Sequence, residues 1–269
     1  MDQLTQDEES NFQNLESELL DLLHGRVRQG TFEFDEGPVV VICPELPLTE
    51  LGPLANEKNR NFTKLQKYGD LDALIELYGH VRAQNPSLDV YHRLPRDVKS
   101  DDYTSHVVLL GGIGWNEETG LFQRFQRATS AVPIIQKAVN DLRDGDIFHV
   151  KGVDGEKEKD FYPEFERLGD AEKLLEDVGY IARLQNPFKV SRTLTICNGV
   201  FSHGVYGAVR SLTDAQVRED NEKYLSDRFP SGVFAMLLRI PIGKETVSPD
   251  LQDPQARLYE WPPRQDAKR

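Results

Sequence analysis

The chain has 269 residues, of which 38% are hydrophobic and 29% charged, and its formal net charge is −13. This length is enough for one large α/β domain, or two small ones, with a sizeable core. The acidic surface repels phosphate backbones and so disfavours direct binding of nucleic acid, although a local basic pocket could still bind a small phosphorylated ligand.

The apolar runs, such as residues 39–43 and 233–238, are too short to span a bilayer. The first ten residues carry neither the positive charge nor the apolar core of a secretory signal. Both cysteines, Cys43 and Cys197, end apolar runs, which predicts buried thiols and no disulfide framework. We therefore expect a cytoplasmic protein with no membrane partner.

Residues 1–30 are expected to hold an amphipathic helix over residues 10–24, with Ser10 as N-cap and Gly25 as the stop. One apolar stripe suits a helix packed on its own domain, and it also suits docking to a protein partner or a second copy. The remainder, residues 37–263, is expected to be one α/β domain.

In the first half of that domain, the residue pattern predicts parallel strands joined by crossover connections. Residues 39–43 are apolar on both faces, as in a central strand covered by helices on either side. Further elements are expected as a polar loop or lid at 48–68, a helix at 70–83 capped by Asp70, and strands at 88–94 and 106–110. This order favours an open, mostly parallel Rossmann-like sheet.

The second half contains shorter elements. A helix is expected after Asn116, and then a β-rich insertion at 131–167 built from segments 131–139, 147–150 and 161–165. The elements expected after it are helical turns at 170–177, strands at 180–184 and 193–197, a helix through Leu212, a helix at 213–229 with Thr213 as N-cap, and a strand at 233–242. The tail from residue 243 is expected to wrap the surface.

Two loops at strand ends carry the residues that could bind a ligand. The first contains Gly111, Gly112, Gly114, Trp115 and Asn116. Glycines let backbone N–H groups approach an oxyanion, and the helix that follows adds positive potential. The loop is neither a G-x-G-x-x-G motif nor a P-loop, and the alternative is a tight turn that needs positive φ.

The second loop contains Asn198, Gly199, Ser202, His203 and Tyr206. Ligands of open α/β sheets bind at the carboxyl ends of strands, so we expect both loops to face one crevice. In this interpretation the polar groups of the second loop contact a small anionic or nucleotide-like ligand.

Three residues are candidates for catalysis. His203, in a loop after a strand, is of the type that serves as a general base. Glu45 lies just beyond the strand at 39–43, and Glu117 lies in the first turn of the helix expected after Asn116. No nucleophile loop follows His203, which argues against a cysteine protease. The histidines show no metal-ligand spacing, and we predict neither a metal nor a cofactor.

The segments LLGGIGWN, TLTICNGVFSHGVYGAVRSLTD and RLYEWPP resemble those of an uncharacterised α/β domain of actinobacterial proteins, over residues 37–263. There, similar segments are often joined to helix-turn-helix regulators, whereas the N-terminal segment here is too short and acidic to read DNA. More loosely, the element order resembles TIR, SLOG and nucleoside deoxyribosyltransferase-like domains. That resemblance implies binding or cleavage of nucleotides in signalling or defence, although their glutamate motif has no clear match here.

We therefore expect a domain that binds or senses a nucleotide-like or other small anionic ligand. The alternatives are a hydrolase or N-glycosidase that uses Glu45, Glu117 or His203, and an interaction protein whose loops are only turns.

Overall fold

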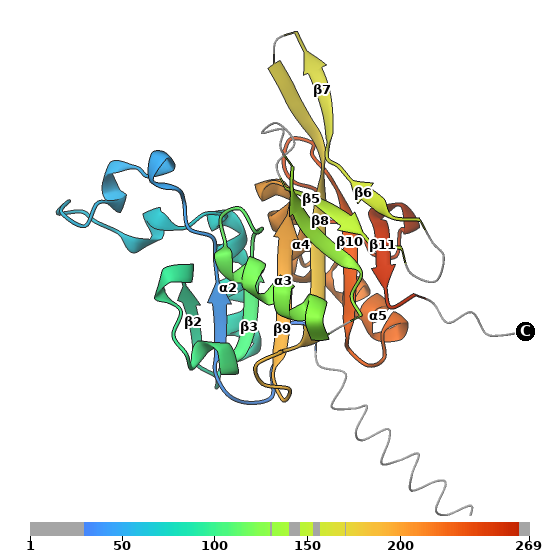
Figure 1. The fold of residues 1–269 in the computed structure, drawn as a ribbon, viewed down its shortest axis with the longest axis horizontal. Coiled ribbons are helices and arrows are strands. Elements are labelled where there is room, and N and C mark those ends of the chain that lie inside the picture. Colours follow the sequence, from blue (N-terminus) through green and yellow to red (C-terminus); the bar gives the residue numbers. More distant parts are fainter. Residues whose placement is uncertain (1–29, 130, 140–145, 153–156, 170, 264–269) are drawn as a thin grey trace, which may run out of the picture.

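The computed structural model describes residues 30–129, 131–139, 146–152, 157–169 and 171–263. The helix expected at residues 10–24 lies outside them. One eight-stranded sheet organises the fold (Figure 1). Its strands, from one edge to the other, are β11 (Arg257–Trp261), β10 (Phe234–Pro241), β8 (Ala171–Gln185), β9 (Thr193–Gly199), β3 (His106–Leu110), β1 (Val39–Ile42) and β2 (Val90–Arg93), with β7 (Glu164–Leu168) paired to β8.

The sheet has a parallel side and an antiparallel side. The strands β2, β1, β3 and β9 are parallel neighbours. On the other side β8 is antiparallel to both β9 and β10, and β11 is antiparallel to β10. The prediction of an α/β fold with a mostly parallel sheet is confirmed, but the sequence did not indicate the antiparallel side.

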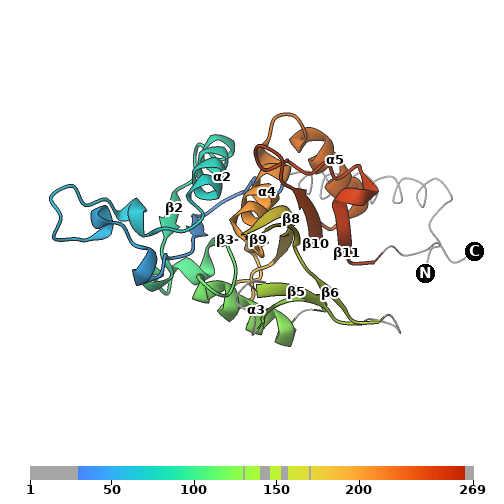
Figure 2. The same ribbon diagram turned by 90° about the horizontal axis from the view of Figure 1, so that it is seen from above.

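Different layers cover the two faces of the sheet (Figure 2). One face carries the helices α2 (Leu71–Gln84), α4 (Ser202–Thr213) and α5 (Arg218–Arg228). The other face carries α3 (Glu117–Thr129) and a three-stranded antiparallel sheet of β4 (Ile134–Ala138), β5 (Asp146–Val150) and β6 (Lys159–Phe161). This small sheet is the expected β-rich insertion.

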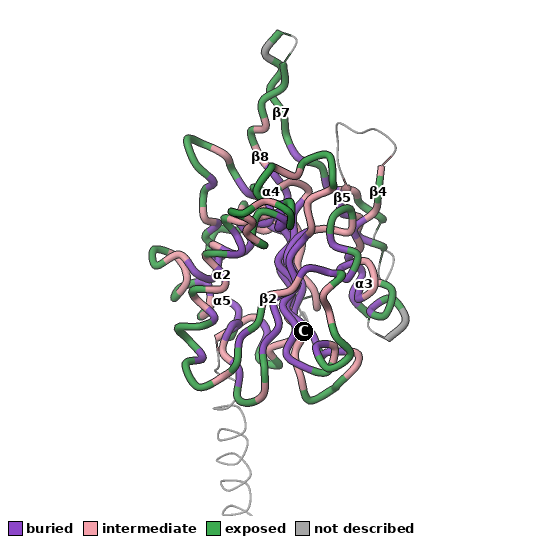
Figure 3. The backbone as a smooth tube through the Cα atoms, turned by 90° about the vertical axis from the view of Figure 1, so that its left-hand side faces the viewer, coloured by how far each residue is buried: buried purple, intermediate pink, exposed green. Residues whose placement is uncertain are grey.

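The double covering explains the composition of the central strands. All residues of β1 and β3 are buried. Figure 3 shows buried backbone running through the centre of the molecule. Strands covered on both faces need apolar side chains at every position, which is why these runs do not alternate. Cys43 and Cys197 are buried free thiols, as predicted, and burial raises the pKa of Cys197 to about 12.

The helical turns expected at residues 170–177 are wrong. Residues from Ala171 onward form the first half of β8, which pairs with β7 up to Glu176 and with β10 from Glu176 onward. The acidic, leucine-containing segment favours helix locally, but a turn or two of isolated helix is marginal, and the hairpin with β7 continues into the central sheet through β10.

Three boundaries also differ from expectation. The segment 161–165 is divided between the two sheets, because β6 ends at Phe161 and β7 belongs to the central sheet. Thr213 is the last residue of α4 and not the N-cap of the next helix. The tail expected to wrap the surface supplies an edge strand, β11.

Two segments project from the sheet at the carboxyl ends of its parallel strands (Figure 1). One is the expected loop at 48–68, which contains the 3-10 turns Leu48–Glu50, Pro53–Ala55 and Lys64–Lys67. The other is the β7–β8 hairpin. In the described part of the chain, no helix has both the length and the apolar character that crossing a bilayer requires.

Candidate functional site

The glycine loop after β3 is a tight turn whose amides already have partners. Gly111 has a φ of +75°, a conformation that favours glycine, and its N–H donates to the Cys197 carbonyl at 3.0 Å. The Ile113 N–H donates to Gln136 Oε1 at 3.0 Å, and the Asp146 carboxylate accepts from the Gly114 backbone. Side chains of the small sheet therefore occupy the position predicted for a ligand anion.

Gln136, on β4, fills the space between the two predicted loops. Its Oε1 also accepts from Asn198 Nδ2 at 2.8 Å, and its Nε2 donates to the Gly199 carbonyl at 3.3 Å. A Cβ atom on Gly112 would lie 2.6 Å from Gln136 Nε2, so a larger residue there would displace the Gln136 amide from its present position. The structure brings the two loops together, as expected, but the β-rich insertion fills the crevice between them.

None of four pockets formed by the described residues is lined by Trp115, Asn116 or Glu117. Asn116 is buried, and its Nδ2 donates to the carbonyls of Ile42 at 3.2 Å and Leu110 at 2.7 Å, which ties the ends of β1 and β3 together. Glu117, at the start of α3, is exposed. Trp115 is also exposed, with 48% of its surface accessible.

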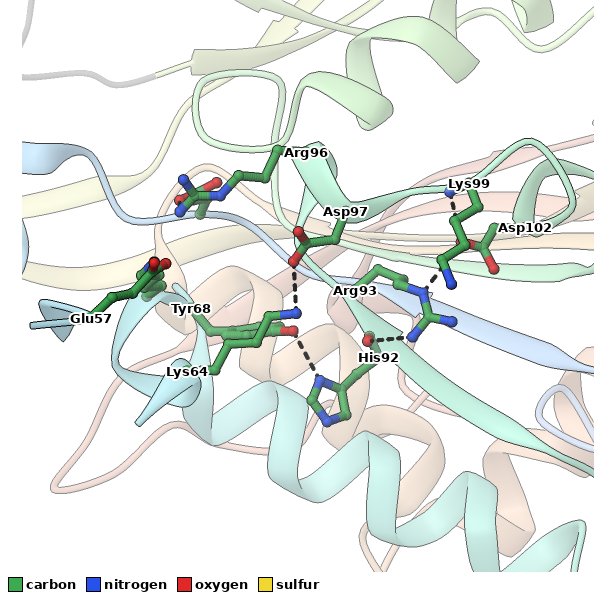
Figure 4. Close-up of polar contacts among 11 residues, drawn as sticks. Glu57, Lys64, Tyr68, His92, Arg93, Arg96, Asp97, Lys99 and Asp102 are labelled. Atoms are coloured by element: carbon green, nitrogen blue, oxygen red, sulfur yellow. Dashed lines mark hydrogen bonds and ion pairs between the residues drawn. The ribbon is translucent and has the colours of Figure 1, made fainter. Parts of the chain in front are cut away.

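Glu45 belongs to a polar network at the ends of β1 and β2. Its carboxylate forms an ion pair with Arg96, and its backbone pairs with Tyr68. The Tyr68 hydroxyl lies 2.9 Å from His92 Nδ1 (Figure 4). Burial raises the pKa of Tyr68 to about 12, so this hydroxyl keeps its proton. The predicted catalytic carboxylate is thus part of the contacts that hold the projecting loop.

The cations of the projecting loop are paired in the same way. Lys64 Nζ lies 2.7 Å from Asp97 Oδ2, as Figure 4 shows, and Lys67 Nζ lies 2.6 Å from Glu57 Oε1. The pair at Lys67 lowers the pKa of Glu57. The Lys64 pair joins the loop to the turn after β2, the Lys67 pair lies within the loop, and both lysines are neutralised by carboxylates.

The N-terminus of α4 is occupied by a carboxylate from β8. Asp177 is fully buried, and its side chain accepts from the backbone N–H groups of Gly204 at 2.6 Å, Phe201 at 3.1 Å and Val178 at 2.8 Å. A helix N-terminus is a natural anion site, and here the protein supplies the anion itself. Burial raises the pKa of Asp177 to about 7, although the three N–H groups favour the charged form.

A pocket of about 650 Å³ lies beside this N-terminus, and we call it the carboxylate pocket. It is lined by Asp70, Leu71, Asp72, Ala73, Ser202, His203, Tyr206, Glu245 and Thr246. His203 Nδ1 lies 2.7 Å from the Thr246 hydroxyl. Of the twelve residues predicted for the site, the pocket brings together Ser202, His203 and Tyr206.

Asp70 is the most unusual residue of the carboxylate pocket. It adopts the left-handed conformation, with φ 48° and ψ 42°, and its side chain makes no capping bond to α2. Burial raises the pKa of Asp70, an effect that a hydrogen bond with Ser202 partly offsets. The charge of Asp70 also contributes to the raised pKa of Asp177. Strained residues of this kind cluster at functional sites, because the strain persists only where the surroundings enforce it.

Sequence reasoning missed four groups of this site. The sequence pattern predicts a helix cap at Asp70, a helical turn at Asp177, and a surface tail at Glu245 and Thr246. The sequence does not show that Asp177 belongs to a strand. Because β8 runs antiparallel to β9, this part of β8 lies beside the carboxyl end of β9. Only pairing between strands far apart in sequence reveals this position.

In the described residues, no three His, Cys, Asp or Glu side chains are grouped as metal ligands would be. Comparisons of the chain with models of protein families, with curated proteins and with solved structures find no match. The predicted resemblance to an actinobacterial α/β domain therefore stays a prediction.

Proposed function

We propose that the chain is a Rossmann-like domain of the cytoplasm that binds a small polar ligand in the carboxylate pocket. The observation that carries this proposal is the state of Asp70. Its backbone is in the left-handed region, its carboxyl pKa is raised, and it lies beside Ser202, the first residue of α4. The pocket also lies at the carboxyl edge of the parallel strands, the usual position for ligands of open α/β sheets.

The charges of the pocket indicate a ligand that donates hydrogen bonds. Three carboxyl groups, those of Asp70, Asp72 and Glu245, line it, and its described lining contains neither lysine nor arginine. Carboxylates accept hydrogen bonds from hydroxyl and amino groups and repel phosphates. A nucleotide-like ligand would therefore present its sugar hydroxyls and base amino group to the pocket. No cationic side chain lines this pocket to bind the anionic group that the sequence led us to expect, so we propose a nucleoside-like ligand.

Aromatic and hydroxyl groups complete this recognition. Tyr206, on α4, presents a half-buried ring to the pocket, and its hydroxyl accepts from Arg210 Nη1 at 3.5 Å. Ring faces of this kind stack on bases and sugars. Ligand binding would then be sensed at the junction of α2 and α4, two helices that pack on each other. The signal would pass to a partner protein, for which residues 10–24 remain the candidate contact.

A hydrolase is the second candidate, because the raised pKa of Asp70 suits proton donation. In that version Asp70 protonates the leaving base of an N-glycosidic bond, and His203 orients or activates water. Glu45 and Glu117 do not line the pocket, so the catalytic roles first expected for them would pass to Asp70.

The test is a thermal-shift screen of the full chain with nucleosides, NAD and cyclic nucleotides at millimolar concentration, compared between the wild type and Asp70→Asn. Asparagine tolerates the left-handed conformation, so the variant keeps its backbone and loses only the charge. A ligand at 100 times its Kd stabilises by about 2.7 kcal/mol, which is roughly 5–10 °C for a chain of this size. We expect that shift in the wild type and its loss in the variant.

Asp89→Asn is the matched control, because Asp89 is exposed just before β2, at the opposite edge of the sheet. If none of the ligands stabilises the wild type, the nucleoside proposal is rejected. An equal thermal shift in Asp70→Asn would show that the ligand binds at another site. Release of free base by the wild type, abolished in Asp70→Asn and retained in Glu117→Gln, would establish the hydrolase.

A further inference from the structure

A second pocket lies at the opposite edge of the central sheet, where β8 ends and β9 and β10 begin. Its volume is about 280 Å³, and we call it the arginine pocket. The polar side chains that line it are those of Arg183, Gln185, Ser191, Arg192, Thr193 and Ser231. Two arginines and three hydroxyl-bearing residues thus line one small cavity of an acidic protein.

Arg183 is the central residue of this pocket. It follows Ile181 on the face of β8 that packs against α4 and α5, so its side chain leaves the sheet among apolar neighbours. Within the described residues, its guanidinium makes no hydrogen bond and no ion pair. Glu222, Asp35 and Glu33 act on it only from beyond ion-pair distance. Burial lowers the pKa of Arg183, the mark of a charge partly withdrawn from water.

Arg192, the second arginine of the pocket, is held through one nitrogen of its guanidinium. Its Nη1 donates to the carbonyl and to the carboxylate of Glu36, both at 3.1 Å. The Glu36 side chain is 72% exposed, so this ion pair is solvated and weak. The same nitrogen lies 3.5 Å from His106 Nε2, and within the described residues no hydrogen bond engages Nε or Nη2 of Arg192. A guanidinium has five N–H donors, so the donors of these two nitrogens stay unpaired.

We propose that the arginine pocket binds a small oxyanion, either a phosphate or a carboxylate group. A partly desolvated guanidinium with unpaired N–H groups is stabilised by an anion that accepts two parallel hydrogen bonds from it. Phosphate and carboxylate groups each have two oxygens at the spacing this requires. The hydroxyl of Ser231, which accepts from the Val233 N–H at 3.3 Å, keeps its own proton and would supply a further donor, whereas the Thr193 hydroxyl is bonded to His106 Nδ1 at 2.9 Å. The volume suits a small ion or the anionic end of a metabolite.

The site is independent of the carboxylate pocket, because no residue lines both. It also assigns a location to the anionic ligand that the sequence favoured, on arginines that the sequence did not single out. The nearby carboxylates of Glu222, Asp35 and Glu33 oppose the anion, so we expect modest affinity that weakens as salt is added.

The experiment is calorimetric titration of the full chain with inorganic phosphate and, separately, with citrate, at constant ionic strength held with chloride. We expect binding of at least one oxyanion, weakened at least tenfold in Arg183→Gln and less in Arg192→Gln. Arg60→Gln is the matched control, since Arg60 is exposed on the projecting loop. The preferred oxyanion identifies the ligand group.

Arg183→Gln removes a charge without a close partner, so the variant is expected to fold, and circular dichroism checks this. Failure of both oxyanions to bind the wild type, or equal binding in Arg183→Gln, would overturn the proposal. Nucleoside binding at the other edge is unaffected by this variant, so the two proposals fail separately.

Discussion

The carboxylate pocket and the arginine pocket lie at opposite edges of the central sheet, one at the carboxyl ends of the parallel strands and the other at their amino ends. The first is lined by Asp70, Asp72 and Glu245, and the second by Arg183 and Arg192. Open α/β sheets usually bind anions at the carboxyl edge, because helix N-termini point there. Here that edge is acidic, and the cations line the pocket at the other edge.

The difference shows why net charge and motif position do not identify a ligand. At the carboxyl edge, Asp177 already satisfies the N-terminus of α4, and Gln136 and Asp146 satisfy the glycine loop. The positive potential of that edge is therefore used inside the protein. At the amino edge, Arg183 keeps its donors free, so local pairing of charges decides which edge attracts an anion.

The largest expected effect comes from breaking the scaffold of the carboxylate pocket with Gly199→Ala. The new Cβ would lie 2.6 Å from Gly204 Cα and close to the Val205 backbone nitrogen, neither of which is free to move. We expect a loss of roughly 4 kcal/mol or more in the free energy of unfolding, or failure to fold. Chemical denaturation measures it.

Gly79→Ala is the control for this prediction. Nothing lies within 4 Å of a Cβ at Gly79, inside α2, so this variant should gain about 0.5–1 kcal/mol. Equal stability of the two alanine variants would show that α4 does not pack closely against β9.

The second prediction concerns the pH dependence that Asp177 imposes. Its pKa is raised from 3.8 to about 7 by burial, so the folded state holds this proton more tightly than the unfolded state. Its contribution to stability is complete below pH 4 and is lost as the pH rises to about 7, by at most roughly 4 kcal/mol. Subtracting the pH profile of Asp177→Asn from that of the wild type isolates this contribution.

The subtraction is needed because His106 has the opposite effect. Burial lowers the pKa of His106 to about 4, so its contribution falls as the pH drops below its ordinary value. Both proteins contain His106, and the difference cancels it. A difference profile that is flat from pH 4 to 8 would show that Asp177 is charged throughout.

The smallest of these effects is expected from Gln136→Ala, which empties the crevice that the sequence predicted as the anion site. The N–H of Ile113 and the side chain of Asn198 lose their acceptor, at a cost of about 1–3 kcal/mol. We further expect this variant to gain stabilisation by sulfate that the control Gln66→Ala, at an exposed loop residue, lacks. Absence of any sulfate effect would mean that the emptied loop does not attract anions.

The pattern of apolar residues along the sequence predicted the strands that are buried throughout and the helix with one continuous buried face. The strand at residues 106–110 is found with the predicted bounds, and the central strand at 39–43 differs by one residue. The helix at 70–83 is also confirmed within a residue at each end. Apolar periodicity and glycine positions determine these elements through neighbours in sequence, which a single sequence displays.

The sequence by itself determined the α/β class, the buried thiols and the approach of two strand-end loops. Only the tertiary structure decided what fills the space between them. Gln136 reaches Asn198 across 62 positions, and Asp177 reaches Gly204 across 27. Such contacts depend on strand order and on which elements cover each face. No local pattern encodes them, because the free energy that fixes them comes from pairing and burial of segments distant in the chain.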